Sequence, residues 1–117
     1  KPLLAGVKGS KLVFALPGNP ASVLTCFMQY VKPSLAQWMG NPASWEQESS
    51  FPLATNWEKQ AKLTVFLKAR LVAGQVEVLP GQESFNLLSF GSADGLIEIG
   101  EDQQALKEGT LVSFYPW

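Results

Sequence analysis

Residues 16–22 combine residue types that favour the binding of an anion. They read Leu-Pro-Gly-Asn-Pro-Ala-Ser and lie between an apolar stretch and a helical pattern. Asn19 is a preferred N-cap residue and Pro20 suits the first helical position. The backbone N–H groups of residues 21–23 would then lie at the positive end of a helix, and Ser22 adds a hydroxyl donor. A capped turn that binds no ligand is the alternative interpretation.

Histidine is absent from the 117 residues and cysteine occurs once. Catalysis by a Ser-His-Asp triad or a Cys-His pair is therefore excluded, as are histidine-ligated metal sites and structural zinc sites. Cys26 falls on the apolar side of the predicted helix, which indicates a small core residue rather than a nucleophile. A single cysteine cannot form an internal disulfide, which is typical of a protein of the reducing cytoplasm.

The composition is that of a globular protein with a core: 46% of the residues are hydrophobic, 16% are charged and the net charge is −1. The near-neutral charge argues against extensive binding of nucleic acid. No apolar run approaches the about 20 residues that cross a bilayer, and no signal-peptide pattern is present. The start at Lys1, without Met, indicates the C-terminal part of a longer polypeptide.

The elements that position the anion-binding segment are two short strands and a helix. Residues 3–7 and 12–16 indicate a hairpin or two adjacent strands, the second too apolar to face water on either side. From Pro20 on, apolar residues recur at three- and four-residue spacing, as in a helix packed on a sheet. Pro33 predicts a kink or restart, and Gly40 the end of the helix. Together they indicate the closing unit of an α/β layer.

The second half of the chain has β character. Residues 41–56 indicate a linker or irregular crossover, with Trp45 and Trp57 as packing anchors. Strands separated by Gly-containing turns follow, which indicates a small barrel or sandwich. In the first strand the apolar side chains alternate and leave Lys68 on the opposite, polar face. The predicted strands are residues 62–71, 75–79, 96–99 and 110–115.

Four segments resemble the molybdopterin molybdenumtransferase family, which includes MoeA and the gephyrin E domain. Residues 13–27 resemble its Pro-Gly-Asn-Pro-x-Ser loop with both flanks, and residues 31–40 resemble the continuation of its helix. Residues 87–96 are similar to its Leu-Ser-x-x-x-Ala-Asn-Gly-Leu segment. Glu108-Gly109 before a terminal strand matches the end of the family's pattern. The similarity spans nearly the whole chain, in the right order.

The resemblance implies two domain pieces and an activity. Residues 1–43 would be the C-terminal piece of the molybdopterin-binding α/β domain, and residues 44–117 the C-terminal β-barrel domain. The activity would be the magnesium-dependent insertion of molybdate into adenylylated molybdopterin, a transferase step of molybdenum cofactor biosynthesis. The full-length protein would be a cytoplasmic homodimer that acts on small molecules, with no nucleic acid or membrane partner. The chain alone is expected to be inactive.

The resemblance also implies a set of binding residues and no catalytic nucleophile. Ser22 matches the serine of the loop, Ser89 matches the serine of the Leu-Ser segment, and Lys68 falls where the family usually has Arg. Molybdate is a tetrahedral dianion and needs cationic, N–H and O–H donors, so the protein would act by positioning and charge neutralisation. The residues implied to bind molybdate and the pterin are Lys1, Pro2, Gly18, Asn19, Ser22, Lys68 and Ser89.

The chain departs from the family pattern at Lys68 and at two positions near it in the predicted pocket. Lys68 keeps the charge of the usual Arg but lacks its bidentate fork. Gly91 stands where many relatives carry Arg, and Asp94 replaces the usual Asn, which lowers the positive potential at the rim of the pocket. Without the family, Lys68 would be a solvated charge and Ser89 would bond its local backbone.

Two other functions fit the same features. One is a non-catalytic scaffold or interaction module of the gephyrin type. The other is an enzyme that adenylylates the pterin, and the barrel-like second half argues against it because those relatives lack that domain.

Overall fold

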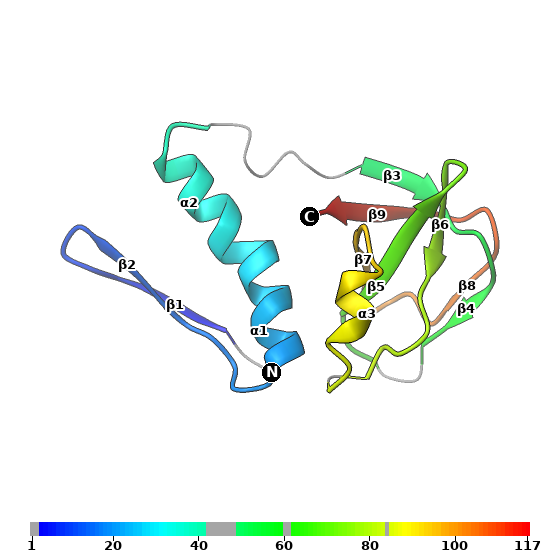
Figure 1. Cartoon of the computed structure of the whole chain (residues 1–117), viewed down its shortest axis with the longest axis horizontal. Coiled ribbons are helices and arrows are strands. Elements are labelled where there is room, and N and C mark those ends of the chain that lie inside the picture. The colour runs from blue at the N-terminus through cyan, green and yellow to red at the C-terminus, as the bar shows by residue number, and fades with distance from the viewer. Residues whose placement is uncertain (1–2, 42–48, 60–61, 84) are drawn as a thin grey trace. The chain divides into compact units, whose positions relative to one another are not determined.

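The computed structural model describes residues 3–41, 49–59, 62–83 and 85–117. The chain divides into two compact units (Figure 1). The first comprises Lys1–Glu46 and Glu83–Leu87, and the second comprises Gln47–Gln82 and Leu88–Trp117.

The first unit begins with a hairpin of two antiparallel strands, β1 (Leu4–Lys8) and β2 (Lys11–Ala15). This confirms the predicted hairpin. The expectation that the second strand is covered on both faces is wrong for the described residues, because Val13 is 51% exposed and most of the other side chains of the hairpin are exposed as well. Within the described residues the two strands pair only with each other, so the predicted α/β layer is not confirmed.

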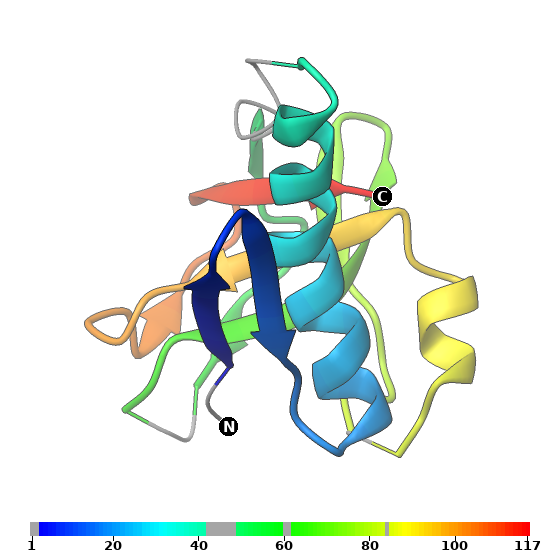
Figure 2. The ribbon, with the colours of Figure 1, turned by 90° about the vertical axis from the view of Figure 1, so that its left-hand side faces the viewer.

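The predicted helix forms as one continuous helical rod of three segments, which Figure 2 shows from the side. Its last segment ends at Trp38, and Gly40 just beyond the helix takes a φ of +94° and donates its N–H to the carbonyl of Gln37. The start at Pro20 is confirmed, and Gly40 stops the helix as predicted. The three consecutive segments of the rod are α1 (Pro20–Cys26), the π-helical η1 (Phe27–Val31) and α2 (Lys32–Trp38).

A π-helical segment lies just before Pro33, where the sequence predicted a kink or a restart of the helix. Proline has no N–H and cannot take its place in a regular α-helical ladder. The chain widens by one residue there, so that Lys32 donates its N–H to the carbonyl of Phe27, five positions back. The hydroxyl of Ser34 donates to the carbonyl of Tyr30 at 2.6 Å. The helix therefore continues through Pro33 instead of breaking.

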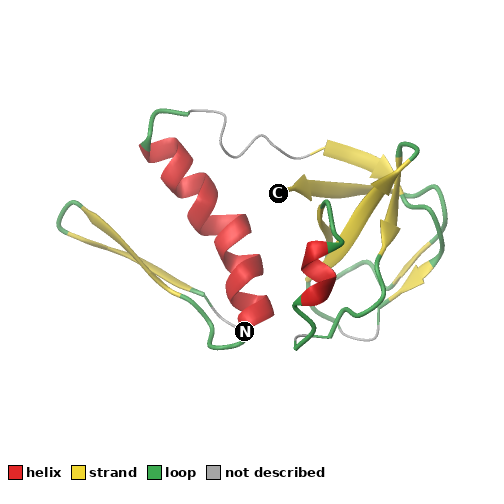
Figure 3. Cartoon of the chain, viewed as in Figure 1, coloured by secondary structure: helices red, strands yellow, loops and turns green. Residues whose placement is uncertain are grey.

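The second unit is built on a five-stranded antiparallel sheet in the order β3-β9-β7-β5-β6. Figure 3 shows the strands in yellow. A parallel bridge between Leu53 and Val76 links the chain after β3 to β6 at the opposite edge, so the sheet curls into a half-barrel. A two-stranded sheet, β4-β8, accompanies it. The elements are β3 (Ser49–Pro52), β4 (Trp57–Glu58), β5 (Val65–Val72), β6 (Gln75–Val78), α3 (Leu88–Gly91), β7 (Gly95–Ile99), β8 (Ala105–Leu106) and β9 (Leu111–Pro116).

The half-barrel encloses the hydrophobic core. Trp57 packs against this core, as predicted for a packing anchor. Trp45, the second predicted anchor, lies outside the described residues. The buried core residues are Leu53, Leu67, Ala69, Val76, Ile97, Ile99, Leu106, Val112 and Phe114.

Two expectations for this half of the chain are corrected. The predicted linker at residues 41–56 contains β3, whose sequence Ser-Ser-Phe-Pro is rich in turn formers and becomes a strand by pairing with β9. The first predicted strand begins at Val65 and not at Lys62, and Leu63 is exposed. No helix in the described part of the chain is long and apolar enough to span a membrane.

Candidate functional site

The predicted binding residues fall into three groups. Lys1 and Pro2 lie outside the described residues. Gly18, Asn19 and Ser22 belong to the first unit, and Lys68 and Ser89 belong to the second.

The loop before α1 caps the helix with its own asparagine. Asn19 is the N-cap residue, and its side-chain oxygen accepts hydrogen bonds from the N–H of Ser22 at 3.2 Å and from the hydroxyl of Ser22 at 3.4 Å. The N–H of Val23 donates to the carbonyl of Asn19. The predicted N-cap is thus confirmed, and Asn19 takes two of the N–H groups that were expected to face an anion. Gly18 is exposed, with open space where a side chain would begin.

Lys68 and Ser89 converge on a single carbonyl oxygen. Lys68 lies in the centre of β5 and Ser89 in α3. The Nζ atom of Lys68 donates to the carbonyl of Gly81 at 2.7 Å, and the hydroxyl of Ser89 donates to the same oxygen at 3.0 Å. The structure therefore brings together two predicted binding residues from separate parts of the sequence.

Lys68 is a buried lysine, although its strand position predicts a solvated charge. Its relative exposure is 3%, and its Nζ atom lies 4.9 Å from the centroid of the Phe90 ring. A buried ammonium group needs acceptors, and here the Gly81 carbonyl and the face of Phe90 serve as two of them. Alternation along β5 fails to predict this burial because both faces of the strand are covered at this point.

An aromatic pair holds α3 against the sheet. The rings of Phe90 and Trp117 lie 5.8 Å apart, and the indole N–H of Trp117 donates to the carbonyl of Ala93. Trp117 is thus a packing residue. The contacts fix the helix that carries Ser89.

Gln82 is a further member of this cluster, and sequence reasoning misses it. Its side-chain oxygen accepts from the N–H of Lys68 at 3.0 Å. Its side-chain nitrogen donates to the carbonyls of Lys68 and Leu79, at 2.8 and 2.7 Å. The sequence offers only the Pro80-Gly81 turn in front of it as a signal, because nothing in the pattern indicates which backbone groups the turn approaches.

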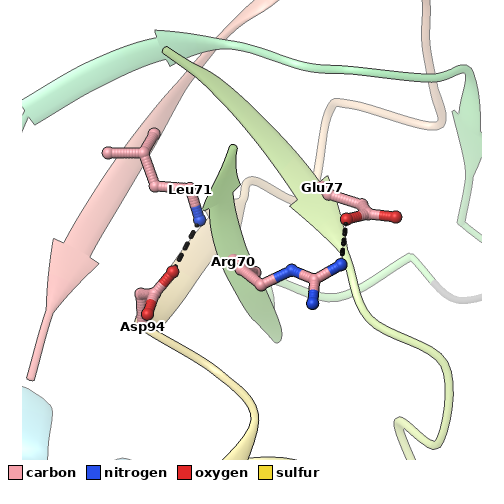
Figure 4. Close-up of polar contacts among 4 residues, drawn as sticks. All are labelled: Arg70, Leu71, Glu77 and Asp94. Carbon is pink, nitrogen blue, oxygen red and sulfur yellow. Dashed lines mark hydrogen bonds and ion pairs between the residues drawn. The ribbon is translucent and has the colours of Figure 1, made fainter. Parts of the chain in front are cut away.

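Asp94 forms hydrogen bonds with the backbone near the end of β5 (Figure 4). Its carboxylate accepts a hydrogen bond from the N–H of Leu71 at 2.9 Å, and its own N–H donates to the carbonyl of Ala69. Figure 4 also shows the exposed ion pair between Arg70 and Glu77, which face each other on β5 and β6 at 2.7 Å. The hydrogen bond and the charge of Glu77 raise the pKa of the Arg70 guanidinium.

A second buried lysine has a structural role. Lys59 is 7% exposed, and its Nζ atom donates to the carbonyls of Gly100 and Glu101. These contacts fix the turn after β7. Lys59 binds backbone carbonyls as Lys68 does, but in the described residues no predicted binding residue shares its acceptors.

Among residues 3–41, 49–59, 62–83 and 85–117, no three side chains of His, Cys, Asp or Glu lie together in a way that could hold a metal ion. Magnesium, which the resemblance implies, stays a prediction. The described cluster offers hydrogen-bond donors and one buried cation, which is the chemistry of an oxyanion site.

Comparisons with known proteins agree with this architecture. The MoeA C-terminal region (domain IV) matches residues 50–117. The sequence is 26% identical over 124 residues to the molybdopterin molybdenumtransferase of Synechocystis, covering 100% of this chain and 29% of that protein. It is 33% identical over 111 residues to molybdopterin molybdenumtransferase 2 of Mycobacterium tuberculosis, covering 93% of this chain and 27% of that protein.

The fold is similar to the crystal structure of a molybdopterin biosynthesis MoeA protein from Pyrococcus horikoshii. The TM-score is 0.76 at 27% sequence identity, over 90% of this chain and 27% of that chain.

The chain belongs to the MoeA family, and its residues 50–117 are the C-terminal region, domain IV. It spans less than a third of the length of the curated relatives described above.

Proposed function

We propose that this chain is part of a molybdopterin molybdenumtransferase, and that Lys68 and Ser89 bind an oxyanion of the substrates. The observation that carries the proposal is the convergence of the Lys68 ammonium and the Ser89 hydroxyl on the Gly81 carbonyl. Relatives whose names state this activity match nearly the whole chain, which supports the choice of molybdate as the anion.

The chemistry of the pair fits a tetrahedral oxyanion. Hydrogen bonds to an ionised acceptor are stronger than bonds to a neutral carbonyl, so an oxyanion competes with the Gly81 carbonyl for both donors. Lys68 would neutralise charge and Ser89 would fix the orientation of the anion, and neither residue would form a covalent bond. Lysine offers a point charge where an arginine would offer a bidentate fork, so the orientation depends more on Ser89.

The loop in front of α1 is included in the same proposal. The hydroxyl of Ser22 and the open backbone at Gly18 are groups that an oxyanion or a phosphate could approach. The hydroxyl now donates to Asn19 at 3.4 Å, a long and weak contact that a stronger acceptor can replace. Lys1 and Pro2 are kept as proposed binding residues because the resemblance implies them.

The proposal also covers the reaction step, the oligomeric state and the division into domains. Molybdate would be inserted into adenylylated molybdopterin, in a magnesium-dependent step, by a cytoplasmic homodimer. Residues 1–43 would belong to the molybdopterin-binding α/β domain and residues 44–117 to the β-barrel domain. The chain alone would be inactive because it spans less than a third of its curated relatives.

Calorimetric titration of the intact protein with molybdate tests the proposal. Ser89→Ala removes one donor to the anion and is expected to weaken binding about tenfold, the equivalent of about 1.4 kcal/mol. Ser22→Ala is expected to weaken it to a similar or smaller degree. Ser92→Ala is the matched control, because Ser92 is exposed just beyond α3.

The titration also has an outcome that overturns the proposal. An intact protein that does not bind molybdate would exclude the oxyanion site and would favour the scaffold function. Equal affinities of the wild type, Ser89→Ala and Ser92→Ala would exclude Ser89 as a ligand.

A further inference from the structure

The side chain of Gln82 extends the pairing of β5 beyond the end of β6. The last residues of β6 follow the antiparallel register, with Ala69 opposite Val78, and the N–H of Leu79 then donates to the carbonyl of Lys68. Pro80 interrupts this ladder because it has no N–H. Beyond Leu79, the side-chain carboxamide of Gln82 forms the next hydrogen bonds to β5: it accepts from the N–H of Lys68 and donates to the carbonyl of Lys68.

The same side chain closes the turn on itself. Gln82 donates to the carbonyl of Leu79, three residues earlier, so both ends of the Pro80-Gly81 turn are tied together. Gly81 takes a φ of +74°, a conformation that favours glycine. Because the turn is bonded to the backbone of β5 at Lys68, its carbonyl is held near the Nζ atom of the same lysine.

Lys68 is therefore linked to the turn in two ways. Its backbone bonds the Gln82 carboxamide, and its Nζ atom bonds the Gly81 carbonyl at 2.7 Å. Ser89 bonds the same carbonyl from α3 at 3.0 Å. The position of the Gly81 oxygen thus determines where the ammonium and the hydroxyl meet, and Gln82 fixes that position.

We propose that Gln82 is a positioning residue of the oxyanion site: its carboxamide holds the Gly81 turn so that the ammonium of Lys68 and the hydroxyl of Ser89 are assembled at one point before the anion binds. The inference rests on the proposed function and adds to it a residue that contacts no substrate. Donors that are already held in place lose less conformational freedom when the anion binds, so preassembly raises affinity.

Molybdate titration of the intact protein with Gln82→Ala tests the inference. The variant is expected to bind molybdate about tenfold more weakly, since the donors are no longer held together. Saturating molybdate is expected to restore the turnover number, because Gln82 acts on binding and not on the reacting atoms. Gln82→Met, which keeps the length of the side chain without its polar atoms, serves as a second variant in case Gln82→Ala does not fold.

A double-mutant cycle separates positioning from a general structural effect. If Gln82 acts through the Gly81 carbonyl, the loss of affinity in Gln82→Ala and the loss in Ser89→Ala will not multiply in the double variant. Gln104→Ala is the matched control, because the Gln104 side chain also donates to a backbone carbonyl, that of Glu101, on an exposed turn. It is expected to bind molybdate as the wild type does.

The outcomes distinguish the two proposals. If the wild type does not bind molybdate, the proposed function and this inference both fail. If the wild type binds and the Gln82 variants bind equally well, only the role of Gln82 is wrong. Losses of affinity that multiply in the double variant would also overturn it, since they would show that Gln82 and Ser89 act independently.

Discussion

Lys68, a proposed binding residue, also has a structural role. Its ammonium is almost fully buried, and it interacts with the Gly81 carbonyl and the face of Phe90. Burial of a charged group costs free energy unless hydrogen-bond acceptors bind it, and here the Gly81 carbonyl and the Phe90 ring do so. The lysine therefore contributes to stability in the absence of any anion.

The first prediction is that Lys68→Met lowers the free energy of unfolding by about 1–3 kcal/mol, because the Gly81 carbonyl loses a charged donor and the ring of Phe90 loses its cation. Chemical denaturation followed by tryptophan fluorescence measures the change. Lys107→Met is the matched control, since Lys107 is exposed and the change should stay within about 0.5 kcal/mol. Equal stability of the two variants would contradict the structural role of Lys68.

Single residues were predictable from the sequence where a local rule or a motif applies. The capping role of Asn19 follows from local chemistry, whereas the binding roles of Lys68 and Ser89 come from the resemblance and stay predictions. Gln82 follows from neither, because its three hydrogen bonds depend on the path of a turn relative to β5. The burial of Lys68 also depends on which segments pack against β5, and the sequence pattern does not show that.

The strand β7 begins at a point of very close packing. A Cβ atom at Gly95 would clash with the carbonyl oxygen of Tyr115 and lie 2.8 Å from the Phe114 ring. Both neighbours belong to β9, which pairs with β7 in the centre of the sheet. The pairing of these two strands therefore requires glycine here.

The second prediction follows from this contact. Gly95→Ala is expected to lower the free energy of unfolding by about 2–4 kcal/mol, because the backbone of β9 must move to admit the methyl group. Thermal unfolding measures the loss. Gly91→Ala is the control: a Cβ at Gly91 meets nothing within 4 Å, and this glycine lies in α3, where alanine is favoured. A Gly95→Ala variant as stable as Gly91→Ala would contradict the register of β7 and β9.

Elements were predictable to the extent that their sequence pattern is local. The helix from Pro20 and the strand β5 follow from apolar periodicity. The strand β3 was missed because its pairing with β9, and not its own residues, makes Ser49–Pro52 a strand. The π-helical segment was expected only as a kink or restart, since Pro33 forbids a regular ladder but does not choose between a break and a wider turn.

The two units differ in how well their strands are covered. The side chains of β1 and β2 are mostly exposed, with Leu4 at 71% and Val7 at 74%. In the second unit, Ile97 and Ile99 of β7 are fully buried. Amide groups exchange with solvent through local opening, which costs less free energy where few apolar contacts are lost.

The third prediction is therefore a contrast in hydrogen exchange within the 117-residue chain. Hydrogen-bonded amides of β5 and β7 are expected to exchange at least about 100-fold more slowly than those of β1 and β2. Exchange followed by NMR at single-residue resolution measures the ratio. Similar protection of the hairpin and of β7 would show that the hairpin is covered as well as the core.

The sequence alone was sufficient for the features set by neighbours along the chain: the capped helix start, the Gly-containing turns between strands, the β character of the second half and the family. Local backbone preferences and apolar periodicity carry that information. The meeting of Lys68, Ser89 and Gln82 around the Gly81 carbonyl became visible only in the folded chain. Such a cluster depends on which strand and helix lie against a turn, and long-range packing decides that arrangement.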